Sequence, residues 1–269
     1  MFATTDLVKK LIPQSLMVLG AVVASVWSAT SAHAFQIYFG EDAGLGSFTR
    51  LSSRPNADAA RNQFLSNLVN VRTEDLESFS DDQTTPLNLS FIGSGSSPAI
   101  ATLQGGGFIN TLSGNSTDGL GRYPISGKNY WDSGSDFSIS FSRPVAAFGF
   151  YGIDIGDVFG KLTLTVADGT TTNLTVPSTL SSNRLDGAVL FFGIIAENSS
   201  QLFTQVKFGN STFNTAVVDR FGFDDFMIGH PKPPDPPTIR EVPEPTSGLG
   251  ILSLGALGVG WSRIRQMWC

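Results

Sequence analysis

Strict alternation of apolar and polar residues is the clearest pattern in the middle of the chain. Residues 137–141 (FSISF) and 162–166 (LTLTV) both alternate, which predicts two strands that each bury one face. An Asp-Gly pair follows the second segment and leads into residues 171–176, the pattern of a β-hairpin. Further apolar segments predict five more strands, at residues 87–92, 145–151, 188–195, 202–208 and 219–228.

Two of these segments are apolar at successive positions rather than at alternate ones. They contain residues 148–150 (FGF) and 190–192 (LFF). A strand that is apolar on both faces is covered on both sides. We therefore expect these two strands at the centre of a sheet.

One helix is predicted, at residues 55–69. A proline opens this segment, and Ala60, Phe64 and Leu68 follow four residues apart on one helical face. Many short strands with Gly-rich turns and one helix are typical of a mainly β protein, here an antiparallel, jelly-roll-like β-sandwich. We expect residues 35–230 to form this single domain.

Composition narrows the range of functions. The 269 residues include 17 Lys or Arg and 23 Asp or Glu, for a net charge of −6, and residues 35–230 alone carry 11 and 19, a net charge of −8. Nucleic-acid binding needs a basic surface, so it is not expected. The only Cys is Cys269 and the two His are His33 and His230, which argues against an intrachain disulfide, a usual zinc site and His-dependent nucleophilic catalysis. We therefore expect that the protein is not an enzyme.

The N-terminus has the pattern of a secretory signal peptide over residues 1–34. Two lysines precede an apolar, helix-forming segment at residues 16–27, and Ala32 and Ala34 form an A-x-A cleavage site. An N-terminal membrane anchor is the alternative, but the apolar segment is shorter than the roughly 20 residues of a span. We expect signal peptidase to cut after Ala34, so that the mature protein begins at Phe35.

The C-terminus has a proline-rich linker followed by an apolar segment. Seven of the fifteen residues at 231–245 are proline, which favours a stiff, extended linker, assigned to residues 231–241. Residues 246–262 are apolar, Gly-rich and uncharged, and Arg263 and Arg265 follow them. This order predicts a marginal transmembrane helix whose basic end stays in the cytoplasm.

Residues 242–269 resemble a PEP-CTERM sorting signal. The motif Val242-Pro243-Glu244-Pro245, the apolar span, and Arg263 and Arg265 carry the resemblance. It implies a transient inner-membrane anchor that an exosortase recognises and cleaves near the motif, releasing the protein to the cell envelope or extracellular matrix. The alternative is an ordinary C-terminal anchor and a permanently attached single-pass surface protein.

The central domain is also similar to a β-sandwich ectodomain of exported PEP-CTERM proteins. The residues that carry this similarity are Gly40-Glu41-Asp42, Asn56-Ala57, Ala59-Ala60-Arg61, Thr73-Glu74, and ranges 144–157, 191–193 and 219–228. The similarity implies a fold and a destination. It implies no activity.

Acidic residues near the first and last strands suggest a calcium site. Calcium is bound by six to eight oxygen ligands, and Glu41 or Asp42 with Asp224 or Asp225 could supply several of them. Successive strand residues point to opposite faces, so we expect at most one of the last two to face a given site. The alternative is a set of solvated turn carboxylates.

Two further groups have candidate roles at a sugar surface. Asp154 and Asp157 lie close enough to serve as a glycosidase carboxylate pair, but a role as turn residues is the favoured interpretation. Tyr130 and Trp131 lie in a polar, Gly-rich stretch, where exposed rings could stack on the apolar faces of sugars. The alternative is that these rings fold onto the edge of the sandwich.

Together these features predict an exported bacterial envelope or matrix protein. We expect its ectodomain to be a structural or exopolysaccharide-associating module. The alternative from another class is a surface hydrolase that acts on polysaccharide with carboxylates.

Overall fold

The computed structural model describes residues 35–93, 98–155, 160–166, 171–177, 186–210 and 220–233. The predicted signal peptide, the predicted sorting motif and the apolar C-terminal segment lie outside these ranges. The described elements are β1 (Phe35–Asp42), α1 (Pro55–Ser66), β2 (Leu68–Glu74), β3 (Leu87–Gly93), β4 (Ala99–Gly105), β5 (Phe108–Thr111), β6 (Asn129–Ser133), β7 (Phe137–Val145), β8 (Ala147–Ile153), β9 (Gly160–Val166), β10 (Thr171–Thr175), β11 (Val189–Ala196), the 3-10 helix η1 (Ser199–Gln201), β12 (Phe203–Asn210) and β13 (Phe221–Pro231).

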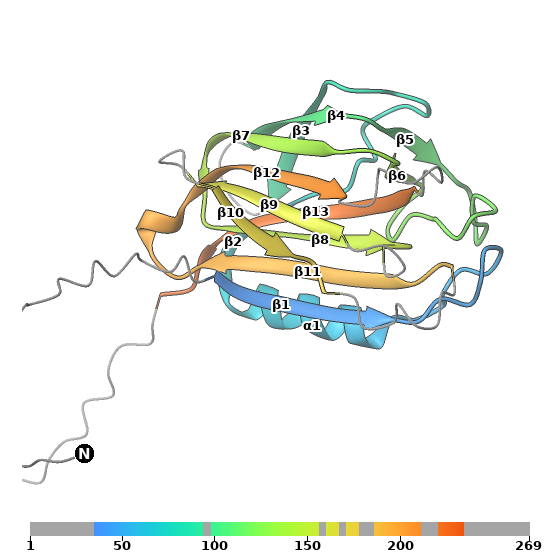
Figure 1. Cartoon of the computed structure of the whole chain (residues 1–269), viewed down its shortest axis with the longest axis horizontal. Helices are drawn as coiled ribbons and strands as arrows, with labels where there is room; N and C mark the ends of the chain where they lie inside the picture. The colour runs from blue at the N-terminus through green and yellow to red at the C-terminus, as the bar shows by residue number, and fades with distance from the viewer. Residues whose placement is uncertain are drawn as a thin grey trace, which may run out of the picture.

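The strands form one antiparallel sheet that curls into two layers (Figure 1). Its order is β1-β11-β8-β13-β2-β3-β4-β7-β12-β9-β10, and β6 pairs with both β13 and β5. Strand β3 joins the layers, because its last residues pair with β2 and the preceding ones with β4. The mainly β, antiparallel sandwich expected from the sequence is confirmed.

The two strands expected at the centre are central. Strand β8 lies between β11 and β13, and β11 lies between β1 and β8. Phe148 and Phe150 enter the core between the layers, whereas Tyr151 and Phe191 belong to a second apolar cluster under α1. These strands are apolar on both faces because the opposite layer of the sheet covers one face and helix α1 covers the other.

Helix α1 packs on the outer face of the β1–β11–β8 region, as Figure 1 shows. Asp42, at the end of β1, stabilises its first turn: one carboxylate oxygen accepts the Asn56 N–H at 3.2 Å and the other the Ala57 N–H at 2.9 Å. The helix ends at Ser66, three residues before the expected end, because Leu68 already begins β2. Leu68, which was predicted to lie on the buried face of the helix, is therefore buried in β2 instead.

The two ends of the described chain leave the same end of the sandwich. Phe35 pairs with Ala196, and the registers of β11, β8 and β13 place Ala147 and Gly229 at that same end. We call it the stalk end, because the proline-rich linker begins there (Figure 1). Across the described ranges, no helix has the length and apolarity needed to cross a membrane.

Candidate functional site

The carboxylates assigned to calcium are not gathered into one site. Strands β11 and β8 separate β1, which carries Glu41 and Asp42, from β13, which carries Asp224 and Asp225. Asp42 instead caps α1. Within the part of the chain that the structure describes, no group of three or more His, Cys, Asp or Glu side chains is arranged to hold a metal.

Asp224 and Asp225 hold a long loop against the sheet. Asp224 is fully buried, and one of its oxygens accepts the backbone N–H groups of Ile125 at 2.7 Å and Ser126 at 3.0 Å. Asp225 accepts the Ser126 hydroxyl at 2.7 Å. The expectation that the two carboxylates would face opposite sides is therefore wrong, because a bulge in β13 and the positive φ of 49° at Asp225 break the alternation.

Burial governs the ionisation of this pair. Loss of solvent raises the pKa of Asp224 well above its ordinary value, the charge of Asp225 raises it further, and the three backbone N–H donors oppose the rise. Burial likewise raises the pKa of Asp225, while Ser126, Arg61 and Arg54 lower it. Both carboxyls are thus engaged in fixing the loop, which supports a structural role.

Tyr130 and Trp131 are fully buried on β6, so the prediction that they contact glycan at the surface is wrong. The Trp131 ring packs edge-on against Phe137, with centroids 6.2 Å apart, and lies directly over Gly107, where an added Cβ would meet it at 2.4 Å. Strand β6 is covered because it pairs with both β5 and β13. The rings fold into the core, as in the alternative interpretation.

Of the two carboxylates considered for a hydrolase, only that of Asp154 lies among the described residues. Asp154 is buried at a positive φ of 64° and accepts the backbone N–H of Gly187 at 3.1 Å. Asp157 lies outside the described residues. The Asp154 carboxylate therefore stabilises a turn through its hydrogen bond to Gly187.

An exposed apolar tip lies at the end of the sandwich opposite the stalk. Phe48 is 82% exposed, Leu45 and Leu120 are each 59% exposed, and these residues come from two loops. The loops are joined, because the Ser47 carbonyl accepts the Gly121 N–H at 3.0 Å and the Thr117 hydroxyl at 2.6 Å. We call Leu45, Phe48 and Leu120 the apolar tip.

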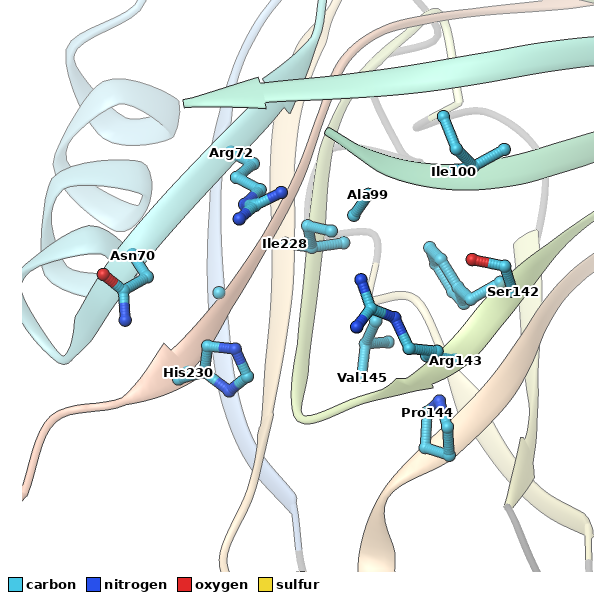
Figure 2. Close-up of a pocket in the computed structure, with 12 residues that line it drawn as sticks. Asn70, Arg72, Ala99, Ile100, Ser142, Arg143, Pro144, Val145, Ile228 and His230 are labelled. Carbon is cyan, nitrogen blue, oxygen red and sulfur yellow. The ribbon is translucent and has the colours of Figure 1, made fainter. Parts of the chain in front are cut away.

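A pocket of about 480 Å³ opens at the stalk end, between β2 and β13 of one layer and β4 and β7 of the other (Figure 2). Two irregularities in strand pairing shape it. Opposite β13, the register of β2 shifts near Asn70, which has a positive φ of 53°. Opposite β12, residues 141–144 of β7 bulge out between Ser140 and Val145.

The pocket combines two arginines and a histidine with apolar side chains. Arg72, Arg143 and His230 surround the opening, as Figure 2 shows. The remaining lining residues are Asn70, Ala99, Ile100, Phe141, Ser142, Pro144, Val145, Ile228 and Gly229. None of the described residues that line the pocket is acidic, so a pocket with basic character lies in an acidic domain.

Sequence patterns did not identify these two surfaces. Arg72, Arg143 and His230 are far apart in the sequence, and only the long-range sheet topology brings them together. The one local signal is Pro144, since a proline inside a strand indicates an edge or a bulge. Phe48 lies between glycine-rich and polar residues, a pattern that carries no signal for an exposed ring.

The C-terminal tail defines the class of the protein. Residues 241–265 match the PEP-CTERM protein-sorting motif. The prediction of a PEP-CTERM tail is confirmed, and the motif implies an exported protein that is anchored transiently in the membrane and sorted to the cell surface by an exosortase.

Two further comparisons add little to this assignment. A search of curated proteins finds no match to the chain. Among solved structures, the K2 cleaved adhesin domain of Lys-gingipain is similar at 14% identity, covering 59% of this chain and 97% of that one with a TM-score of 0.34. A superposition this loose carries no argument about function.

Proposed function

We infer that the ectodomain is an exopolysaccharide-associating module that acts outside the cell after signal peptidase and exosortase have processed the chain. Its role is attachment within the envelope or matrix, without catalysis. The sorting motif supports the destination, and the apolar tip supports the mode of association.

The observation that carries this proposal is the exposure of Phe48. Phe48 is 82% exposed, so its apolar ring is in contact with water. Burial of the ring against an apolar face of a ligand would therefore be favourable. The C–H faces of sugar rings are apolar, and an aromatic ring can stack on them. Leu45 and Leu120, each 59% exposed, lie in the same two joined loops.

The tip is held in place before any ligand binds. Besides the two bonds to the Ser47 carbonyl, the Gly46 N–H donates to the Asp186 carbonyl at 2.9 Å, and the Ser47 hydroxyl donates to the Asp186 carboxylate. A preorganised loop loses less conformational entropy on binding than a mobile one. The tip also lies at the end of the sandwich opposite the stalk end, so it is accessible both before and after the C-terminal tail is removed.

Retention on the host's own exopolysaccharide tests this function. The exported protein, purified from its producing cells, is compared with Phe48→Ala, Phe48→Tyr and Ile92→Ala. Ile92 is the matched control, since it is 71% exposed on β3 and outside the tip. We expect Phe48→Ala to reduce retention severalfold and the other two variants to keep it; equal retention of all four proteins contradicts the proposal.

A further inference from the structure

We propose that the stalk-end pocket binds an acidic sugar residue of the extracellular polysaccharide, with Arg143 as the principal carboxylate-binding group. This inference rests on the proposed association with exopolysaccharide and names the chemical class of glycan. It concerns a surface distinct from the apolar tip.

Charge is the first argument. The domain carries a net charge of −8, and such a surface repels polyanions. The pocket is an exception, because Arg72 and Arg143 line it and no carboxylate is among its described lining residues. An anionic group is therefore attracted to this pocket more than to the surrounding acidic surface.

The backbone geometry is the second argument. The β7 segment that carries Arg143 leaves its ladder with β12, since Val145 pairs with Phe203 and the next paired residue is Ser140. Pro144 has no N–H to donate, which favours this departure. The bulge places Arg143 on the opening rather than along a regular strand face, and its side chain is exposed.

The third argument is the apolar part of the lining. Ile100, Pro144 and Val145 lie beside the cationic groups, and Ser142 and Asn70 add hydrogen-bonding groups. A sugar acid has matching parts: a carboxylate for a planar guanidinium, hydroxyls for the polar groups, and C–H faces for the apolar ones. The volume of about 480 Å³ lies within the range of roughly 300–1,000 Å³ found for small-molecule sites.

The pocket serves a glycan better than a lipid headgroup. The sorting motif supports the proposed release of the protein from the membrane, and at that step a lipid site at the stalk end would lose its ligand. A glycan ligand is present at the destination of the released protein. Phospholipid binding is accordingly an outcome of the test and not part of the proposal.

The test uses calorimetric titration of the exported protein with a galacturonate tetramer and with a neutral galactose tetramer. The variants are Arg143→Gln, Arg143→Lys and Lys128→Gln. Lys128→Gln is the matched control, because Lys128 is exposed and lies outside the pocket. This substitution also removes one positive charge, as Arg143→Gln does. We expect binding of the acidic tetramer only, weakened roughly tenfold or more by Arg143→Gln, less by Arg143→Lys, and unchanged by Lys128→Gln.

Three results would overturn the inference. They are equal binding of both tetramers, equal effects of Arg143→Gln and Lys128→Gln, and binding of phosphatidylglycerol vesicles without binding of the acidic tetramer. The outcome is separable from that of the proposed function. Unchanged retention of Phe48→Ala on exopolysaccharide leaves the pocket result intact, and a failed Arg143 test leaves retention through the tip intact.

Discussion

The carboxylate of Asp224 accepts the backbone N–H of Ile125 across 99 positions of sequence, at 2.7 Å. The same carboxylate accepts the N–H groups of Ser126 and Asp225. A single buried side chain thus satisfies three backbone donors and ties the long loop before β6 to the middle of β13. Asp224 is therefore a main anchor of that loop, beside the bond from the Ser126 hydroxyl to Asp225.

Replacing Asp224 tests this dependence. Asp224→Ala leaves the buried N–H of Ile125 and the partly buried N–H groups of Ser126 and Asp225 without their acceptor. An unsatisfied buried group costs about 1–3 kcal/mol, and a partly buried one costs less. We expect a loss of roughly 2–5 kcal/mol in the free energy of unfolding and faster amide exchange at Ile125 and Ser126. Urea denaturation and hydrogen exchange measure both. The control is Asp81→Ala, an exposed aspartate that accepts one N–H from Thr111 at 2.9 Å, for which a smaller loss is expected; equal losses in the two variants argue against the anchor.

Glu74 gives a prediction about pH. This glutamate is 4% exposed, and burial raises the pKa of its carboxyl, although the N–H groups of Ser90 and Leu76 lower it. The folded protein therefore holds this proton more tightly than the unfolded chain does. The stabilisation is complete below the unfolded pKa of about 4.3 and declines as pH rises through that value toward the folded pKa.

The variant Glu74→Gln lacks this titration. We expect the free energy of unfolding of the parent, relative to the variant, to fall between pH 3.5 and pH 7 in urea denaturation series, where roughly this range brackets the carboxyl titration. Glu197→Gln, which changes an exposed glutamate, corrects for the loss of one acidic group. A difference that rises with pH contradicts the proposed cause.

Gly193 tests the packing under the helix. A Cβ added at this position would lie 2.8 Å from the Phe64 ring and 2.9 Å from the Phe191 ring. Gly193→Ala should therefore lower the free energy of unfolding by about 1–3 kcal/mol through overpacking. Gly209→Ala is the control, because its nearest contact is the exposed Asp136 side chain at 3.4 Å. Thermal unfolding of the two variants compares them directly, and a neutral Gly193→Ala would mean that α1 lies farther from β11.

The variant Trp131→Ala tests whether this ring contributes to stability or to ligand binding. Because the ring is fully buried, Trp131→Ala should cost about 3–5 kcal/mol of stability. Loss of exopolysaccharide retention should then follow the unfolded fraction, measured by circular dichroism on the same sample. Reduced retention by a fully folded Trp131→Ala protein would restore this ring as a ligand contact.

Terminal mapping tests the processing of the chain. Phe35 begins β1, pairs with Ala196 and packs against Phe203 with ring centroids 6.1 Å apart. We expect intact-mass analysis of the extracellular fraction to find a species that starts at Phe35 and lacks the chain beyond about Pro245. A species in the membrane fraction that still ends at Cys269 would instead indicate permanent anchoring.

The local sequence pattern predicted much of the sandwich because strand alternation and double-faced apolar segments are local consequences of burial. The segments at residues 137–141 and 148–150 lie where their patterns indicated. Strand β6 (NYWDS) shows why other elements were missed. All five of its residues are buried, polar ones included, because distant strands and ion pairs surround them.

The candidate sites were harder to predict for the same reason. Asp132, for example, is buried because Arg220 donates to it at 2.8 Å, a pairing across 88 positions. Sequence spacing cannot indicate whether an acidic or aromatic residue will meet such a partner. Tyr130 and Trp131 were therefore assigned to the surface although they lie in the core, and the exposed side chain of Phe48 was not predicted.

The position of the linker has a mechanical consequence. The linker continues from β13. This strand runs the length of the sandwich and is hydrogen-bonded to β8 on one side and to β2 and β6 on the other. A protein held by matrix at the tip and by glycan in the stalk-end pocket, which β13 lines, carries the tension along this strand. Its inter-strand hydrogen bonds are perpendicular to that direction, so they resist together in shear instead of opening one at a time. The fold therefore suits an attachment that must survive flow.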